Sequence, residues 1–389
     1  MISEKKYFKN KLLYISPSVF PSQAANSTHV ILQAHALSKY FDHVHVIGIS
    51  SKDNFSKNQI IQILQNTYDL DFKKMYFSFF KNFFGIAENF MIAIFSIPLM
   101  ISSRDHHIIT RNIYAAFFAL IFFKRNFIYE THTVEKGFKK AIQNLILKSK
   151  KVSTIVISKK LKELLIENYK TINNIHILHD AARSDLESYV DQELFEYEKF
   201  KKYSAIVGYF GSLLPGRGIE IIDQIAEKMP DLLFFVCGPD NQNMDFQKKA
   251  NLQDSNIFFG GFIDHKIIHK TMSSCDVLLM PYQKKVFIDN KGSDTSKWMS
   301  PMKMFEYMAT GRPIISSDLP VLREVLVNGF NALLVSPANI NEWVRAIESI
   351  QINKELGMKL AKNARKDYLD RFNWNSRAKI IKEIFNGMP

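Results

Sequence analysis

Ser300-Pro-Met-Lys-Met-Phe-Glu-Tyr-Met-Ala-Thr-Gly-Arg-Pro-Ile-Ile-Ser316 decides the fold, because it predicts a short helix, a glycine turn and a buried strand in succession. Ser300 suits the N-cap and Pro301 the first position of that helix, so backbone N–H groups at its start are available to an anion. Lys303 adds a cation at the same end. Glu306, one turn later, adds a carboxylate that accepts hydrogen bonds from a cis-diol such as ribose. The stretch therefore predicts a site for a diphosphate and a ribose.

The rest of the chain alternates short apolar runs with helical patterns, which is typical of a doubly wound α/β protein. Strand Lys11–Ser16, helix Val30–Tyr40 and strand Val44–Gly48 are predicted to form a first βαβ unit, whose ligands lie beyond the carboxyl ends of the strands. A second series begins at strand Ala205–Gly211. A chain of 389 residues also exceeds one ordinary core. We predict an N-terminal domain, a C-terminal domain and a terminal helix, at residues 1–190, 191–370 and 371–389 respectively.

The residues from Pro301 to Pro313 have the spacing P-x-K-x-x-E-Y-M-A-x-G-x-P, which closely resembles the C-terminal half-motif of the retaining GT-B glycosyltransferases of family four. The resemblance implies two Rossmann-like domains facing across a cleft, with the last helix crossing back to the N-terminal domain. It implies that Glu306 contacts the ribose of a nucleotide sugar and that Lys303 faces the diphosphate. The family has another glutamate eight positions upstream, which contacts the transferred sugar. This chain has Trp298 there, so only the second role carries over.

The resemblance implies further site residues. Arg217 lies in a glycine-rich loop where the family has a basic residue that contacts the diphosphate, and His132 resembles the N-domain histidine that hydrogen-bonds the donor sugar. An ordinary helix N-cap at Ser27 or Thr28 is an open alternative to a substrate contact there. The candidate catalytic residues are Arg217, Lys303 and His132; the donor-binding candidates are Glu306, Gly211, Ser212, Ser300, Met302 and Asp294; the acceptor-side or cleft candidates are Asn26, Ser27, Arg111 and Glu130.

The predicted reaction depends on positive charge. A departing nucleoside diphosphate gains negative charge in the transition state, and Arg217, Lys303 and a helix N-terminus are suited to stabilise it. No metal or other cofactor is expected. The Asp69-Leu-Asp71 pattern matches a metal-binding D-x-D only formally, because it precedes a lysine-rich segment and does not end a strand. No glycosidase-like pair of carboxylates is recognisable, so retention through a same-face ion pair is what the resemblance implies.

A net charge of +13 indicates an anionic partner, unless it reflects a genomic bias toward lysine codons. Nucleotide-sugar phosphates and anionic lipid both qualify. Nucleic acid is not predicted, because zinc-finger spacing, an RNP-type aromatic pair and basic heptads are missing from the sequence. Nine lysines suggest a basic amphipathic surface for anionic lipid, or a solvated helix face; they are Lys136, Lys139, Lys140, Lys148, Lys150, Lys151, Lys159, Lys160 and Lys162.

The apolar run Met75–Ile101 is interrupted by Glu88 and Pro98, so we predict helices that pack on the sheet or rest on a membrane surface. The first residues are polar and predict no signal peptide. Cys237 and Cys275 lie in apolar runs and are expected to be buried thiols in a reducing compartment. We therefore expect a cytoplasmic protein, with a peripheral position on the inner face of a membrane as the extension of that hypothesis.

The leading hypothesis is a glycosyltransferase that moves a sugar from a nucleotide-sugar donor to a glycan or lipid-linked acceptor with retention, in surface polysaccharide or glycoconjugate biosynthesis. One alternative is a nucleotide-sugar epimerase on the same scaffold, against which the Lys303–Gly311 motif argues. Another is a non-catalytic GT-B binding subunit, suggested by Trp298.

Overall fold

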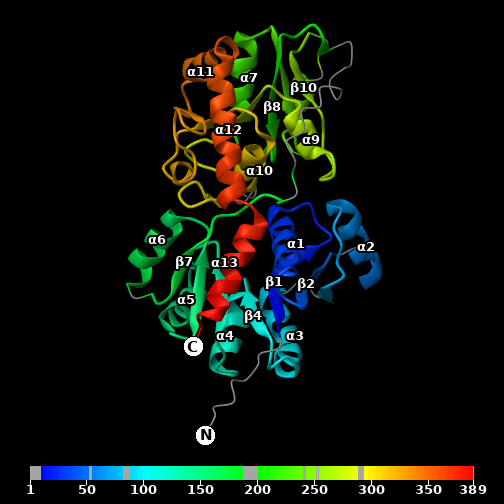
Figure 1. Ribbon diagram of the computed structural model, residues 1–389, viewed down its shortest axis with the longest axis vertical. Coiled ribbons are helices and arrows are strands. Elements are labelled where there is room, and N and C mark those ends of the chain that lie inside the picture. Colours follow the sequence, from blue (N-terminus) through cyan, green and yellow to red (C-terminus); the bar gives the residue numbers. More distant parts are fainter. Residues whose placement is uncertain are drawn as a thin grey trace. The chain divides into compact units, whose positions relative to one another are not determined.

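The computed structural model divides into two compact units. Unit 1 comprises Met1–His179 and Trp374–Pro389, and unit 2 comprises Asp180–Asn373. The described residues are 10–51, 55–81, 88–170, 172–184, 186, 200–239, 242–250, 252, 254–287 and 293–388. The domain boundary predicted between residues 190 and 191 lies outside them. Each unit is built on a parallel sheet with helices packed against it (Figure 1).

The sheet of unit 1 has the strand order β3-β2-β1-β4-β5-β6-β7, with every neighbouring pair parallel. Its strands are β1 (Lys11–Phe20), β2 (His43–Ser50), β3 (Met75–Phe80), β4 (His107–Thr110), β5 (Phe127–Thr131), β6 (Val152–Val156) and β7 (Ile175–Ile177). The helices of this unit are α1 (Ala25–Leu37), α2 (Lys57–Tyr68), α3 (Glu88–Ser102), α4 (Ile113–Ile121), α5 (Phe138–Lys148), α6 (Lys159–Tyr169) and α13 (Trp374–Asn386).

Strand β1 lies between β2 and β4, which explains why its residues Leu12 to Ile15 are apolar and buried on both faces. The strand order reverses at this point, since β2 and β3 extend to one side and β4 to β7 to the other. Ligands of doubly wound sheets bind beyond the carboxyl ends of the strands at such a reversal. In this unit Asn26 follows β1 and Arg111 follows β4.

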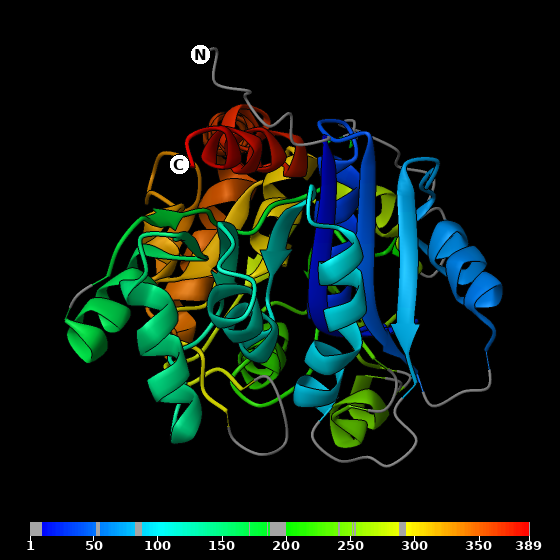
Figure 2. The same cartoon turned by 90° about the horizontal axis from the view of Figure 1, so that it is seen from below.

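Helices α3, α4 and α5 cover one face of this sheet. Their inward residues, among them Ile92, Ala116 and Ile146, share a core cluster with the strands. Right-handed crossovers that advance from β4 to β7 place α4, α5 and α6 on the same face, and Figure 2 shows these helices in front of the strands. Helix α13 packs against α1 within the same unit, although the two helices are far apart in sequence (Figure 1).

The apolar run at residues 75–101 is not wholly helical, and the prediction was wrong for its first part. Met75–Phe80 forms the edge strand β3, in which Tyr76 is exposed between two buried neighbours. This alternation and the aromatic side chains favour a strand. Helix α3 follows with Pro98 inside it and packs on the sheet, as predicted for that part. Among the described residues, every helix is too short or too polar to cross a membrane.

The sheet of unit 2 has the strand order β10-β9-β8-β11-β12-β13 and is also parallel. Its strands are β8 (Ala205–Phe210), β9 (Leu232–Cys237), β10 (Ile257–Phe259), β11 (Val277–Met280), β12 (Ile314–Ser317) and β13 (Leu333–Val335). The helices are α7 (Ile219–Lys228), α8 (Met244–Ala250), α9 (Ile268–Ser273), α10 (Met302–Thr310), α11 (Ile340–Ile352) and α12 (Lys354–Arg371), with a 3₁₀ turn at Leu322–Glu324.

Two core clusters fill the two faces of this second sheet. One contains residues of α9, α10 and α12, and the other contains residues of α7, α8 and α11. Cys237 and Cys275 are buried free thiols, as the sequence predicted. The strand order reverses between β8 and β11, so ligands are expected beyond the ends of these two strands.

Helix α10 begins one residue later than predicted. Pro301 is the N-cap and Met302 the first helical residue, whereas the sequence suggested Ser300 and Pro301 for these places. The Ser300 hydroxyl does not cap the helix, because it accepts a hydrogen bond from the backbone N–H of Asp180 at 3.0 Å. Gly311 ends the helix with φ +68°, a left-handed conformation that glycine adopts without strain.

Candidate functional site

The loop between β8 and α7 lies at the strand reversal of unit 2 and depends on two glycines. Gly216 has φ +82° and Gly218 has φ +87°. A Cβ atom would meet the carbonyl oxygen of Lys285 at 1.9 Å in the first case and that of Pro281 at 1.9 Å in the second. Only glycine permits this approach, so the loop lies directly against the segment that follows β11.

Arg217, between these glycines, shares a tyrosine with Lys303. Its Nη1 donates to the Tyr282 hydroxyl at 3.3 Å and its Nη2 to the Phe287 carbonyl at 3.0 Å. Lys303 Nζ lies 4.9 Å from the centroid of the Tyr282 ring and 4.1 Å from that of Tyr209. The structure therefore brings together two predicted catalytic cations that are far apart in sequence.

The ammonium group of Lys303 is buried, and its Nζ has no hydrogen-bond partner within the described part of the chain. Burial and the neighbouring charge of Arg217 hold the pKa of Lys303 well below its ordinary value, against the opposing effect of Glu306. A Cβ atom on Gly211 would lie 2.9 Å from this Nζ, so the glycine leaves room for the lysine. A buried cation without a partner is costly and indicates a site prepared for an anion.

Glu306 lies one turn after Lys303 on α10. Burial raises the pKa of Glu306 to about 7, although Lys303 lowers it. The carboxyl group therefore changes charge near neutral pH. In its ionised form it offers only acceptors, which suits contact with hydroxyl groups.

The remaining donor-side candidates have roles within unit 2. Ser212 Oγ lies 2.8 Å from Gln242 Oε1, which also accepts from the Leu213 N–H at 2.8 Å. Asp294 Oδ1 accepts from the backbone N–H groups of Val286 at 3.0 Å and Ser296 at 2.9 Å. Burial alone would raise the pKa of Asp294, but these backbone hydrogen bonds lower it. Asp294 thus holds the backbone at Val286 and Ser296. Met302 is half-buried at the first position of α10.

In unit 1, Glu130 is fully buried at the carboxyl end of β5 and gathers several polar side chains. Its Oε1 lies 2.8 Å from His29 Nε2, 2.9 Å from His132 Nε2 and 3.4 Å from Arg377 Nη2, and its Oε2 accepts from Gln33 Nε2 at 2.8 Å. Burial would raise the pKa of Glu130, but Arg377, His29 and His132 together hold it well below its ordinary value. We call these five residues the Glu130 network.

The network continues to Arg111 and Asn26. Arg111 Nη2 lies 3.1 Å from His132 Nδ1, and its Nη1 donates to the Asn26 carbonyl at 3.4 Å. Because a guanidinium only donates, His132 Nδ1 accepts, and Nε2 carries the proton directed at Glu130. The Ser27 hydroxyl is used within the fold, since it donates to the Val19 carbonyl at 2.8 Å. All four predicted acceptor-side residues thus lie near the strand reversal of unit 1.

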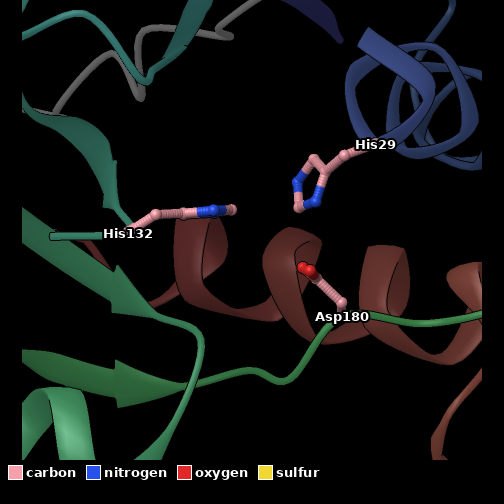
Figure 3. A group of neighbouring side chains, drawn as sticks. All are labelled: His29, His132 and Asp180. Carbon is pink, nitrogen blue, oxygen red and sulfur yellow. The ribbon is translucent and has the colours of Figure 1, made fainter. Parts of the chain in front are cut away.

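Figure 3 shows the His29 and His132 rings pointing toward each other, one from α1 and one from the end of β5. Their centroids are 5.1 Å apart in an edge-on arrangement. On helix α13, the Trp374 ring lies 4.8 Å from that of His29. Arg377, on the same helix, donates from Nε to the His179 carbonyl at 3.0 Å. Helix α13 therefore packs directly against His29 and supplies one of the partners of Glu130.

Sequence reasoning missed Tyr209, Tyr282, Gln33 and Arg377 as members of these sites. The two tyrosines come just before β8 ends and just after β11 ends, so the doubly wound pattern could have suggested them. Arg377 gave no such signal. Only the packing of α13 on α1 brings it to Glu130.

The family model described as glycosyl transferases group 1 matches residues 190–367. A solved structure of Anabaena HepE in complex with UDP-glucose superposes with a TM-score of 0.69, 15% sequence identity and coverage of 97% of this chain and 99% of that one. The fold is therefore GT-B, as the resemblance implied. Residues 190–367 of this chain therefore match a group 1 glycosyltransferase domain.

Curated relatives agree with this assignment. The glycosyltransferase TuaH of Bacillus subtilis (strain 168), named for teichuronic acid biosynthesis, is 28% identical over 143 residues, which cover 35% of this chain and 34% of that relative. An uncharacterized glycosyltransferase of Methanocaldococcus jannaschii is 23% identical over 339 residues, covering 82% of this chain and 79% of that one. The match thus spans about a third of the first relative and most of the second.

Proposed function

We propose that this protein transfers a sugar from a nucleotide-sugar donor to a glycan or lipid-linked acceptor, with retention of configuration. The observation that carries the proposal is the pair of cations Arg217 and Lys303, which share Tyr282. The Nζ atom of Lys303 is buried and has no hydrogen-bond partner in the described chain. A diphosphate would supply the negative charge that this pair lacks. The bound UDP-glucose of the Anabaena structure is consistent with such a donor.

Each charged residue of this site has a role in the proposed reaction. Arg217 and Lys303 interact most strongly with the diphosphate when its bond to the sugar breaks, because its negative charge is then greatest. Ionised Glu306 accepts hydrogen bonds from the ribose hydroxyls. The charge needed for departure is present in the side chains, so we propose that the reaction requires no metal or other cofactor.

In unit 1, His132 and the residues around Glu130 are proposed to contact the sugar and the acceptor. His132 is held by Glu130 through one ring nitrogen and by Arg111 through the other. A sugar hydroxyl that replaces Arg111 at Nδ1 would donate to it without disturbing the contact to Glu130. The teichuronic acid name of the Bacillus relative supports surface polysaccharide or glycoconjugate synthesis as the pathway. A lipid-linked acceptor would place the protein at the cytoplasmic face of a membrane.

The test combines donor binding and transfer. A panel of nucleotide sugars is screened by thermal stabilisation, because a ligand that binds only the folded state raises its stability by mass action. The stabilising donor is then assayed for release of its nucleoside diphosphate, with and without a chelator. We expect turnover that Lys303→Met abolishes and that Lys359→Met, at an exposed site on α12, leaves intact. Inversion of the anomeric configuration in the product, read by NMR, would contradict the retaining mechanism.

Trp298 favours a second candidate, a non-catalytic binding subunit. The tryptophan stands where the family has the glutamate that contacts the transferred sugar, and it is half-buried in the segment before α10. Binding of nucleotide sugar without either transfer or hydrolysis would favour this candidate. Activity of the unaltered chain would exclude it.

A further inference from the structure

The outward face of α3, α4 and α5 combines exposed apolar side chains with lysines. Phe122 is 66% exposed just after α4, and Phe138 is 78% exposed at the start of α5. Further exposed apolar side chains on this layer are Phe90, Met91, Ile94, Phe95, Ile101, Ile121 and Leu145. A soluble surface rarely exposes so many large apolar groups together unless they form an interaction site.

Aromatic contacts join part of this surface, from α3 to the end of α4, into a patch. The Phe90 ring on α3 lies 5.3 Å from Tyr114 and 6.2 Å from Phe118, both on α4. Phe118 in turn lies 5.7 Å from Phe122. The patch reaches the basic helix at Tyr114, whose ring lies 5.8 Å from Lys139 Nζ. Apolar and basic surfaces are therefore adjacent on one helical layer.

Beside the patch, a groove of about 410 Å³ lies between α5 and α6. Its lining contains Lys140, Lys148 and Lys170 and no acidic residue. Two asparagines complete its polar wall, and Lys140 Nζ donates to Asn168 Oδ1 at 3.3 Å. The chain from residue 136 to residue 151 likewise contains six lysines and no acidic residue. The groove thus fits a small group with negative charge.

We infer that this face docks on an anionic phospholipid membrane, with Phe122 and Phe138 entering the interface and the groove receiving a lipid phosphate. Charge complementarity selects this occupant, because apolar side chains next to a lysine-lined groove match the acyl chains and anionic headgroups of one surface. The inference extends the proposed peripheral location to a specific surface. It does not depend on donor chemistry, since unit 2 contributes nothing to it.

The test measures sedimentation of the full chain with vesicles of phosphatidylglycerol and phosphatidylcholine, and with phosphatidylcholine alone. We expect binding to the mixed vesicles that is lost at high salt. Lys140→Gln with Lys148→Gln should weaken it by about fivefold per lysine. Phe122→Ser with Phe138→Ser should weaken it at every salt concentration at which the unaltered chain still binds. Matched controls in unit 2, Lys359→Gln and the exposed Ile352→Ser, should bind like the unaltered chain.

Two results would overturn the inference. One is absence of binding to mixed vesicles, and the other is binding that the α4–α5 variants leave unchanged or that the controls reduce equally. Stabilisation by UDP is recorded for every variant. It reports on the fold and on the donor site of unit 2 separately, so failure of membrane binding and failure of the proposed transferase function are distinguishable.

Discussion

Replacing Lys303 with methionine should stabilise the free protein while it abolishes function. The ammonium is buried and lacks a hydrogen-bond partner in the described chain, and removing such a charge from water costs several kcal/mol. The Tyr209 and Tyr282 ring centroids lie 4.1 and 4.9 Å from Lys303 Nζ, and each cation–π contact offsets about 1–2 kcal/mol of that desolvation cost. Methionine keeps much of the side-chain volume without the charge. We expect a net gain of about 2 kcal/mol in the free energy of unfolding, from the difference between these terms.

The assay is thermal and urea unfolding at pH 7 without nucleotide, then with UDP. A gain of about 2 kcal/mol corresponds to about 4–8 °C for a domain of this size. UDP at 100 times its dissociation constant should add about 2.7 kcal/mol to the unaltered protein. Most of this increment should be lost in Lys303→Met, because the diphosphate then meets only Arg217.

The matched control is Lys359→Met, on the exposed face of α12. A surface change of this kind is expected to alter stability by less than about 0.5 kcal/mol and to leave the UDP response intact. The reasoning would be refuted if Lys303→Met lost stability as a truncated core residue does. A variant that kept the full UDP increment would refute it equally.

Further predictions concern the other charged residues. Glu306→Gln should weaken nucleotide binding by about 1–3 kcal/mol, as measured by calorimetry, because an amide replaces a double acceptor. The Glu306 carboxyl has a pKa of about 7 in the folded protein and about 4.5 in the unfolded chain, so between these values only the folded protein holds its proton. The free energy of unfolding of the free protein should therefore fall as pH rises from about 4.5 to about 7. Urea titrations of Glu306→Gln should show a smaller fall over the same range. Arg217→Ala should lower kcat more than donor affinity, whereas a chelator should change little; activity that disappears with chelator and returns with magnesium would contradict the metal-free proposal. Glu130→Gln should cost about 3–5 kcal/mol in urea unfolding, because Arg377 would remain buried without its carboxylate; a cost below 1 kcal/mol would show that Arg377 is satisfied by backbone carbonyls alone.

The fold was predictable because its signals are local and repeated. The strand predicted at Ala205–Gly211 begins at Ala205 and ends one residue earlier, at Phe210, since this apolar run is followed by clear turn residues. The GT-B fold is confirmed by the solved structures, and the group 1 glycosyltransferase model matches residues 190–367, the part of the chain that contains the P-x-K-x-x-E motif. The strand Met75–Phe80 was misjudged because a run of aromatic residues fits either a buried helix or a strand when periodicity is short.

The candidate sites were predictable only where a motif carried them. Lys303 and Glu306 lie one turn apart on a single helix, so their spacing shows that they share a face. The pairing of Lys303 with Arg217 follows from the order of strands in a sheet, which the sequence indicates only as a general pattern. Arg377 is not recognisable in this way, because its role comes from the packing of α13 beside α1.

The two polar centres differ in how their charge is balanced, and this difference bears on function. Glu130 has three cationic or protonatable partners and a lowered pKa, so the centre in unit 1 is internally compensated and is suited to hold His132 in one orientation. For Lys303 and Arg217 the described part of the chain shows no comparable carboxylate, since the pKa of Glu306 is raised to about 7. Positive charge without a carboxylate partner destabilises the folded free protein, and binding of an anion restores that stability. Within the described residues, this difference in charge balance supports the proposal that the centre in unit 2 binds the diphosphate and that the centre in unit 1 orients a neutral sugar.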